Sequence, residues 1–218
     1  EHNTPVVLLS DGYLGNGAGP WKIRSVKDMP DITPFVAKEG EEWQSYARDT
    51  QKLARKHALP GTKGLEHRVG GLEKEDITGN ISYEPENHEK MCFLRAEKVE
   101  RVADFISKQE VYGDESGDLL VIGWGGTYGS LYTAVKELRE EGKKVSLAHF
   151  NYINPLPKNT AEIFKNFKNI VVCELNNGQF VDLLKSKHDT FQFKQFNHIQ
   201  GLPFKTTDLK EHFNTLIS

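Results

Sequence analysis

Several kinds of functional site cannot be built from this sequence because the residues they need are missing. The chain has only two cysteines among 218 residues. Cys92 and Cys173 stand apart from one another, and neither belongs to a Cys-x-x-Cys pair or has histidines at metal-ligand spacing. We therefore expect neither a zinc site nor an iron–sulfur cluster on this chain, and any redox metal must come from a partner.

Basic blocks and long apolar runs are missing as well. The chain has 28 Lys and Arg against 31 Asp and Glu, which gives a net charge of -3, and no window is basic enough to follow a phosphate backbone. No apolar run approaches the roughly 20 residues that cross a bilayer, and the start "EHNTPVVLLSDGY" lacks the layout of a signal peptide. We expect no nucleic-acid partner, no membrane association and a cytoplasmic location.

The first part of the chain has little regular pattern. "TPVVLLS", residues 4–10, is a β-branched apolar run typical of a strand buried on both faces, but the glycines and prolines that follow offer little to pair with it. We interpret the chain as beginning inside a domain whose earlier part is absent. Residues 37–83 are rich in charge and glycine without a sustained period, which indicates a linker or a functional excursion.

The second part alternates helices and strands. A helix is expected from Pro85, with Cys92, Ala96 and Val99 on its apolar face. Strands follow at 118–124, 143–153, 169–175 and 191–197, with helices at 130–142, 160–167, 178–187 and 206–217. Such alternation predicts an α/β fold, a three-layer α/β/α domain with a mostly parallel sheet over residues 88–218.

The turn "GWGGTYGS", residues 123–130, is the place to look for a phosphate cradle. A dinucleotide fingerprint needs glycines at offsets zero, two and five, and here Tyr128 stands at the third position. No acid ends the second strand to bind a ribose, and no Walker lysine follows. We therefore favour a tightly packed strand-to-helix turn over a nucleotide site.

Strand ends at the carboxyl edge of such a sheet are common binding surfaces. "CELNNGQF", residues 173–180, ends a strand with an acid and two asparagines, and Glu174 is as easily a helix-capping or interface carboxylate as a ligand-binding one. The candidate interface residues at the strand ends are Gly125, Gly126, Thr127, Glu174, Asn176 and Asn177.

The stretch "GLEHRVGG", residues 64–71, places His67 and Arg68 between the loop-shaping glycines Gly64, Gly70 and Gly71. Glycines permit unusual backbone angles, and an arginine fork suits bidentate recognition of a carboxylate. A solvated loop explains the same residues equally well. No Ser-His-Asp set, His-Glu-x-x-His motif or spaced carboxylate pair indicates a hydrolase.

Four blocks in a fixed order carry a family resemblance. They are "TPVVLLSDGYLGNGAGPW", "LPGTKGLEHRVGGLEKEDITGNISYEPENHEKMCFLRAEKVERVA", "LLVIGWGGTYGSLYTAVKELREEGKKVSLAHFNYINPLPKN" and "VVCELNNGQF". Together they resemble the C-terminal part of the α subunit of 2-oxoacid:ferredoxin oxidoreductases, and the 2-oxoglutarate type in particular. Because the blocks cover nearly the whole chain, the resemblance is specific.

The resemblance implies a complex that converts a 2-oxoacid and CoA into acyl-CoA, CO2 and reduced ferredoxin. It implies thiamine diphosphate, Mg2+ and an iron–sulfur cluster in the full complex, none of them bound by this chain alone. The implied partners are a β subunit, ferredoxin and CoA, with a homodimer as a further option. Residues 1–36 would be the tail of a pyrimidine-binding domain, 37–87 a linker, and 88–218 a domain similar to the C-terminal domain of transketolase.

The family's thiamine-activating residues would lie upstream of Glu1, so the resemblance predicts that this chain is not catalytically complete alone. Within the enzyme, we expect Arg68, with His67, to contribute to recognition of the distal carboxylate of 2-oxoglutarate, which pyruvate lacks, or to a loop that covers the substrate. One alternative is a non-catalytic assembly module of a pyruvate or branched-chain 2-oxoacid oxidoreductase. Another is a free-standing nucleotide-binding protein, which would bind NAD or ATP as an isolated chain.

Overall fold

The computed structural model describes residues 1–217, apart from the side chain of Tyr13. The chain divides into two compact units. Unit 1 comprises Glu1–Val7 and Gly19–Phe105, and unit 2 comprises Leu8–Ala18 and the chain from Ile106 onward. The expected boundary near residue 88 differs from this division, because the structure groups the helix that follows Pro85 with unit 1.

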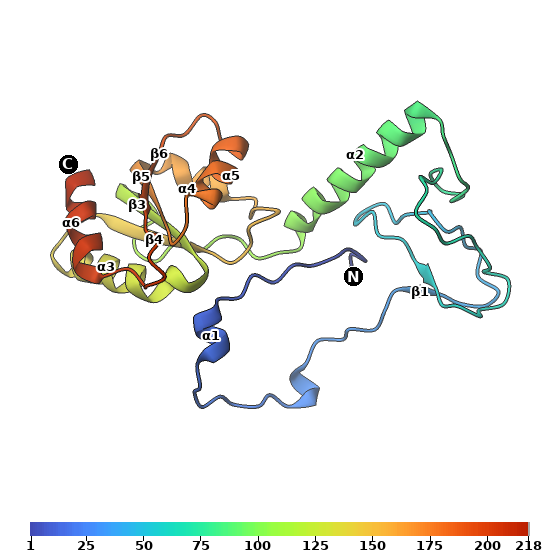
Figure 1. Cartoon of the computed structure of the whole chain (residues 1–218), viewed down its shortest axis with the longest axis horizontal. Coiled ribbons are helices and arrows are strands. Elements are labelled where there is room, and N and C mark those ends of the chain that lie inside the picture. The colour runs from blue at the N-terminus through green and yellow to red at the C-terminus, as the bar shows by residue number, and fades with distance from the viewer. Residues whose placement is uncertain (218) are drawn as a thin grey trace. The chain divides into compact units, whose positions relative to one another are not determined.

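Unit 2 is built on a parallel sheet (Figure 1). Its strands are β3 (Gly117–Trp124), β4 (Val145–Phe150), β5 (Phe167–Glu174) and β6 (Phe193–Asn197), in the spatial order β4-β3-β5-β6. All three neighbouring pairs are parallel. From β3 the chain passes first to β4 on one side and then to β5 on the other side of β3. This change of direction places helices on both faces of the sheet. The predicted α/β fold is confirmed.

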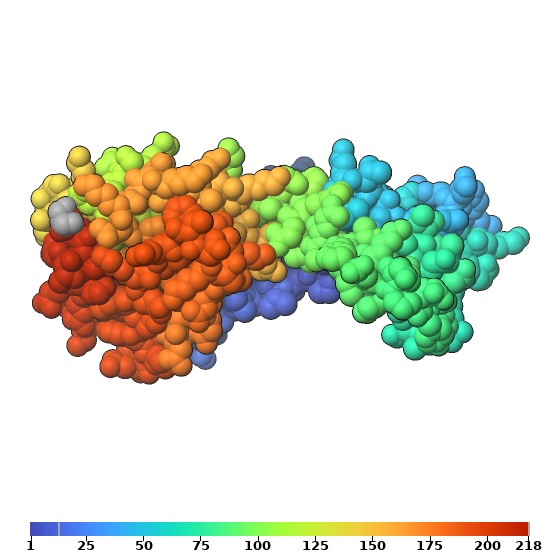
Figure 2. Space-filling view, turned by 90° about the horizontal axis from the view of Figure 1, so that it is seen from above, coloured from blue at the N-terminus to red at the C-terminus, as the bar shows by residue number. Residues whose placement is uncertain are grey.

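The two faces of this sheet are covered by different helices. Helices α3 (Tyr128–Glu140) and α6 (Thr206–Leu216) pack on Leu119 and Val121 of β3. Helices α4 (Thr160–Lys165) and α5 (Gln179–Lys187) pack on Leu120 and Ile122 of the same strand. Successive side chains of a strand point to opposite faces, so this alternation makes three layers. Side chains from the last part of the chain, orange to red, cover much of the visible face of unit 2 (Figure 2).

Unit 1 contains the long helix α2 (Pro85–Arg101) and two short strands, β1 (Val36–Ala37) and β2 (His57–Ala58), which pair in parallel. The predicted helix is confirmed, but its predicted apolar face is wrong, since Cys92 and Ala96 are exposed and Met91 is the buried residue. The reason is that α2 packs against an irregular polar segment: the Arg48 guanidinium lies 3.8 Å from the Met91 sulfur.

Residues 37–83 form ordered structure without a repeating pattern. Antiparallel bridges join Tyr46 to Ile77 and Lys74 to Ile81. The Asp49 carboxylate accepts hydrogen bonds from the backbone N–H groups of Gln51, Lys52 and Ala54, at 2.7 to 3.0 Å. Contacts of this kind depend on individual side chains and therefore leave no periodic signal in the sequence.

The predicted buried strand at residues 4–10 is wrong. The structure assigns no strand there, and Val6, Val7, Leu8 and Leu9 are 59 to 87% exposed. A buried strand needs neighbours for its N–H and C=O groups, and no described strand pairs with this segment. Among residues 1–217, no helix is long and apolar enough to cross a membrane.

Candidate functional site

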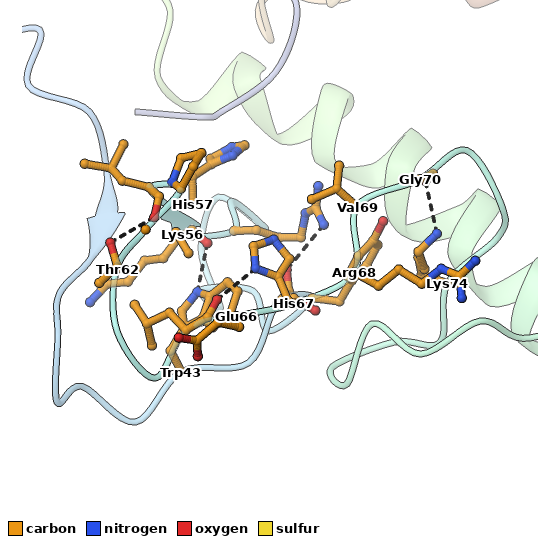
Figure 3. Close-up of a pocket in the computed structure, with 18 residues that line it drawn as sticks. Trp43, Lys56, His57, Thr62, Glu66, His67, Arg68, Val69, Gly70 and Lys74 are labelled. Atoms are coloured by element: carbon orange, nitrogen blue, oxygen red, sulfur yellow. Dashed lines mark hydrogen bonds between the residues drawn. The ribbon is translucent and has the colours of Figure 1, made fainter.

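His67 and Arg68 lie at a cavity of about 530 Å³ within unit 1 (Figure 3). Its walls come from three stretches of the irregular segment and one buried lysine. The lining residues are Trp43, Ser45, Tyr46, the run from Arg55 to Thr62, the run from Leu65 to Gly70, and Lys74. The loop that the sequence singled out is therefore one wall of a formed pocket.

The charge of this pocket is positive. Arg55, Lys56, Arg68 and Lys74 line it, whereas Glu66 is the one acid among the lining residues. The Glu66 carboxylate accepts a hydrogen bond from the backbone N–H of Gly64 at 3.2 Å, so it is turned toward its own loop. A pocket with this balance favours an anionic ligand.

Two of these cations are already engaged with unit 1. Lys56 pairs with Glu41. The Arg55 guanidinium lies 4.0 Å from the centre of the Tyr46 ring and donates to the Ser45 carbonyl at 3.3 Å. These contacts fix the two stems in place, so they build the wall of the pocket.

Lys74 is the buried cation of the pocket, with 2% of its surface exposed. Its Nζ donates to the carbonyl oxygens of Gly70 at 3.0 Å and Leu72 at 2.6 Å. Carbonyl oxygens compensate an ammonium only in part, and a buried charge is costly unless it is paired. The positive charge of Lys74 therefore adds to the attraction of an anion to the cavity.

His67 is held, whereas Arg68 is unengaged. The His67 ring meets the Trp43 ring edge to face at 4.8 Å, and its Nδ1 lies 3.0 Å from the Leu65 carbonyl oxygen. A carbonyl oxygen only accepts, so His67 Nδ1 donates a hydrogen bond to it. Arg68 is exposed, and the structure of residues 1–217 gives its guanidinium no ion pair or hydrogen bond.

One of the three loop glycines has an unusual backbone angle. Gly64 has a φ of +79°, in the left-handed region that a side chain rarely adopts. Gly70 and Gly71 lack a positive φ, and a Cβ at either would meet nothing within 4 Å. Of these two glycines, Gly70 lines the pocket.

Sequence reasoning missed most residues of this pocket, among them Trp43, Arg55 and Lys74. Trp43 and Arg55 lie before the predicted loop, and Lys74 follows it. Trp43 positions His67 and is itself anchored, because its Nε1 donates to the Lys56 carbonyl at 3.0 Å. No local pattern marks these residues, since they meet the loop only through the tertiary fold.

The neighbouring Glu73 ties the pocket loop to α2. Its carboxylate accepts from Arg95 at 3.1 Å (Nη1 to Oε1) and lies 2.7 Å from His88 Nδ1. These hydrogen bonds, from Arg95 first and then His88, lower the pKa of Glu73 to about 2. Glu73 directly precedes Lys74, so the clamp on its side chain fixes the start of the segment that closes the pocket.

The Glu73 clamp predicts a pH-dependent stability of unit 1. Because the folded-state pKa lies below its ordinary value of 4.5, the stabilisation is present above pH 4.5 and is lost as the pH falls toward 2. Glu73→Gln should therefore be less stable than the parent at pH 6, and the difference should vanish near pH 2. Hydrogen exchange of the α2 amides measures it, and a pH-independent difference would contradict the assignment.

The strand-end candidates in unit 2 are chiefly structural. Glu174 is fully buried, and its carboxylate accepts from the N–H groups of Phe180 and Val181, both at 2.9 Å, and from Trp124 Nε1 at 3.2 Å. It therefore caps the first turn of α5, where the N–H groups have no helical partner. Of the readings left open by the sequence, these contacts match the helix-capping one.

The other strand-end residues shape two turns. Gly125 has a φ of +58°, and a Cβ on Gly126 would lie 2.4 Å from an Asp11 carboxylate oxygen. The Thr127 hydroxyl donates to the Trp124 carbonyl at 2.8 Å. The Asn176 side chain accepts from the N–H of Gly178 at 2.7 Å, whereas Asn177 is exposed. Close packing of the first turn, as the sequence favoured, is confirmed.

A shallow hollow lies at this edge of unit 2. It has a volume of about 460 Å³, and its lining includes Gly125, Gly126, Thr127 and Asn176 together with residues 8–11 of the same unit. The segment that carries Asp11 therefore covers the crevice between β3 and β5, which is the usual ligand position in an open parallel sheet. The arrangement explains why Gly126 must lack a side chain.

The turn that leads into α5 depends on Gly178, and a substitution there provides a test. Its φ of +98° is unfavourable for alanine, and a Cβ would lie 2.7 Å from Gln195 Oε1 and 3.1 Å from Val181 Cγ1. Gly178→Ala should lower the free energy of unfolding of unit 2 by about 1–2 kcal/mol. Gly129→Ala is the matched control, since that glycine lies in α3 without a positive φ or a neighbour within 4 Å. Equal urea midpoints for the two variants would refute the prediction.

Comparison with known proteins adds a family context. Residues 117–211 match the family model for the pyruvate:ferredoxin oxidoreductase core domain II. The 2-oxoglutarate oxidoreductase subunit KorA of Mycobacterium tuberculosis is 42% identical over 211 residues, covering 96% of this chain and 32% of that protein. The α subunit of 2-oxoacid:ferredoxin oxidoreductase 1 of Aeropyrum pernix is 28% identical, with coverage of 88% and 31%.

A solved structure agrees with these relatives. The 2-oxoglutarate:ferredoxin oxidoreductase from Magnetococcus marinus, determined with 2-oxoglutarate, coenzyme A and succinyl-CoA bound, superposes with a TM-score of 0.81 at 26% identity. The match covers 89% of this chain and 34% of that chain. The present chain thus spans about a third of the length of these relatives.

Proposed function

The comparisons confirm the predicted resemblance to α subunits of 2-oxoacid:ferredoxin oxidoreductases of the 2-oxoglutarate type, and on this premise we propose that the chain serves as part of such a subunit. The reaction is the oxidative conversion of 2-oxoglutarate and CoA to an acyl-CoA and CO2, with electrons passed to ferredoxin. In this proposal the chain contributes substrate recognition and is not catalytically complete alone.

The observation that carries this proposal is the positive pocket of unit 1 with an unengaged Arg68 at its wall. 2-Oxoglutarate has a second carboxylate that pyruvate lacks. A guanidinium fork binds a carboxylate through two N–H groups, and a site built for that charge rejects a substrate that leaves it unpaired. Arg68 binds the distal carboxylate, and His67, fixed by Trp43 and Leu65, forms the neighbouring wall of the pocket.

The metals implied by the resemblance have no cluster of ligands among the residues described. Within residues 1–217, no group of three His, Cys, Asp or Glu side chains could hold a metal ion. We therefore assign Mg2+ and the iron–sulfur cluster to other parts of the complex, together with thiamine diphosphate, as the resemblance implies. Thiamine supplies the carbanion chemistry there, and this chain supplies orientation and charge complementarity.

The partners in this proposal are a β subunit, ferredoxin and CoA, with a second copy of the subunit as a further option. A cytoplasmic location is the setting expected for such an enzyme.

The proposed function is tested by an activity assay on the whole protein with its partner subunits. With 2-oxoglutarate and CoA, reduction of ferredoxin or a viologen dye should exceed the rate with pyruvate by at least tenfold. Turnover of pyruvate with no activity toward 2-oxoglutarate would contradict the assignment of substrate class. Calorimetry with NAD and ATP on the isolated chain should give no binding, and binding of either would favour a nucleotide-binding protein.

A specific observation also favours the assembly module as a second candidate. Val6 to Leu9 form an apolar run that is 59 to 87% exposed, as expected of a segment that a further domain or subunit covers. Under this alternative, Val7→Asp would prevent assembly, whereas Arg68→Ala would leave the turnover of each assembled complex unchanged. Loss of turnover in correctly assembled Arg68→Ala complexes excludes the module as the whole explanation.

A further inference from the structure

Four side chains of unit 1 form a nucleophile-type cluster away from the pocket lining. Cys92 is exposed on α2, and His88 lies one helical turn earlier on the same face. The Cys92 sulfur is 3.7 Å from His88 Nε2 and 3.2 Å from Arg95 Nη2. Glu73, from the segment opposite α2, lies 2.7 Å from His88 Nδ1.

The order of these contacts matches that of an activated thiol. A nucleophile lies within reach of a base, and the base is oriented by a third group. Since the Glu73 carboxylate only accepts, His88 Nδ1 carries a proton and Nε2 faces the sulfur as an acceptor. Arg95 donates both to Glu73 and to the sulfur, so its charge stabilises the anionic form of the sulfur.

Cys173 provides a built-in contrast. It is fully buried in the sheet core, and burial raises the pKa of its thiol. A buried neutral thiol neither reaches a reagent nor presents a thiolate. Any modification of the folded chain should therefore separate the two cysteines completely.

We propose that Cys92 is a site of reversible modification by thiol–disulfide exchange with small disulfides. His88 Nε2 accepts the thiol proton, and the Cys92 thiolate attacks one sulfur of the disulfide. A new S–S bond forms as the old one breaks, and the departing thiolate leaves with the proton held by His88. Cys92 is oxidised to a mixed disulfide, and the other half of the reagent is reduced to a thiol.

The modification also bears on the pocket. A mixed disulfide changes the sulfur that accepts a hydrogen bond from Arg95 and places bulk against the residues that clamp Glu73. Glu73 directly precedes Lys74 of the pocket. Occupation of Cys92 is therefore expected to loosen the segment that closes the cavity, whichever substrate the cavity takes.

The test measures mixed-disulfide formation with oxidised glutathione at pH 7 by peptide mass spectrometry on the full chain. An ordinary thiol is about 3% thiolate at this pH. With His88 to accept the thiol proton and Arg95 beside the sulfur, Cys92 should react about fivefold to tenfold faster than in the urea-unfolded chain. His88→Gln and Arg95→Met should lose most of this acceleration, and Arg95→Lys should keep part of it.

The matched control is Lys90→Met, because Lys90 lies on the same helix but pairs with Asp76 outside the cluster. It should react like the parent, and Cys173 should stay unmodified in every folded variant. Modification of Cys173 in a variant would show that this variant has unfolded. The Cys92 rates of Arg95→Lys and of the parent would then be compared instead. Equal Cys92 rates in folded and unfolded chains, or in the parent and both cluster variants, would overturn the proposal.

Discussion

Replacing Glu174 by alanine is expected to lower the free energy of unfolding of unit 2 by about 3 kcal/mol. The carboxylate is fully buried and accepts three hydrogen bonds, from the backbone N–H groups of Phe180 and Val181 and from Trp124 Nε1. Its removal leaves these donors buried without partners, and each unsatisfied buried donor costs about 1–3 kcal/mol. The protein relaxes partly and water enters the space, so the expected loss of stability lies near the lower end of the summed cost of the three donors.

Urea unfolding followed by far-UV circular dichroism measures this effect. Glu174→Gln should lower the free energy of unfolding by about half as much. Its amide oxygen still accepts hydrogen bonds, but its NH2 group faces a donor and cannot accept from it. Asp182→Asn is the matched control, since this carboxylate lies on α5 in an exposed pair with Lys185 at 3.8 Å, and it should change stability by less than about 0.5 kcal/mol. A loss of similar size in all three variants would show that Glu174 has no special role.

Replacing Arg68 by alanine is expected to reduce kcat/KM for 2-oxoglutarate by about 10- to 100-fold in the assembled complex, or about 1.4–2.7 kcal/mol of transition-state stabilisation. The reason is that the distal carboxylate loses its cation while the other cations of the pocket stay engaged with their own partners. A monocarboxylate such as pyruvate never meets Arg68, so its kcat/KM should change by less than about threefold.

Two further variants make this prediction specific. Arg68→Lys keeps the charge but loses the planar fork, so its kcat/KM should fall between those of the parent and the alanine variant. Lys63→Ala removes a nearby exposed cation that does not line the cavity, and it should leave the preference unchanged. Equal losses for both substrates, or the same loss in Lys63→Ala, would remove Arg68 from substrate recognition.

The α/β fold of unit 2 could be predicted because its elements repeat with the periods of regular structure. The buried strand "DLLVIGW" and the helix "SLYTAVKELREEG" each carry their burial pattern in their own residues. The role of Glu174 could be narrowed to capping or an interface, since an acid before a helix start suits both. Choosing between them required the distances to Phe180 and Val181.

Unit 1 could not be predicted in the same way. Its order comes from single side chains that bind backbone groups far along the chain, such as Trp43 to Lys56 and Ser45 to Thr78. Such contacts do not repeat along the chain, so the sequence indicated only a linker or functional loop segment that contains His67 and Arg68. The strand prediction at residues 4–10 was wrong for another reason. The composition of this segment favours a strand, but a strand also needs a neighbouring strand to pair with.

The central claim is that the unit 1 pocket recognises the distal carboxylate of the substrate. An experimental structure of the assembled complex with 2-oxoglutarate bound tests it most directly, through the distance from the Arg68 guanidinium to that carboxylate. The account predicts two N–H···O contacts of about 2.7–3.0 Å, with the carboxylate at the cavity lined by His67. A distal carboxylate bound by other residues, with Arg68 still facing solvent, would contradict it.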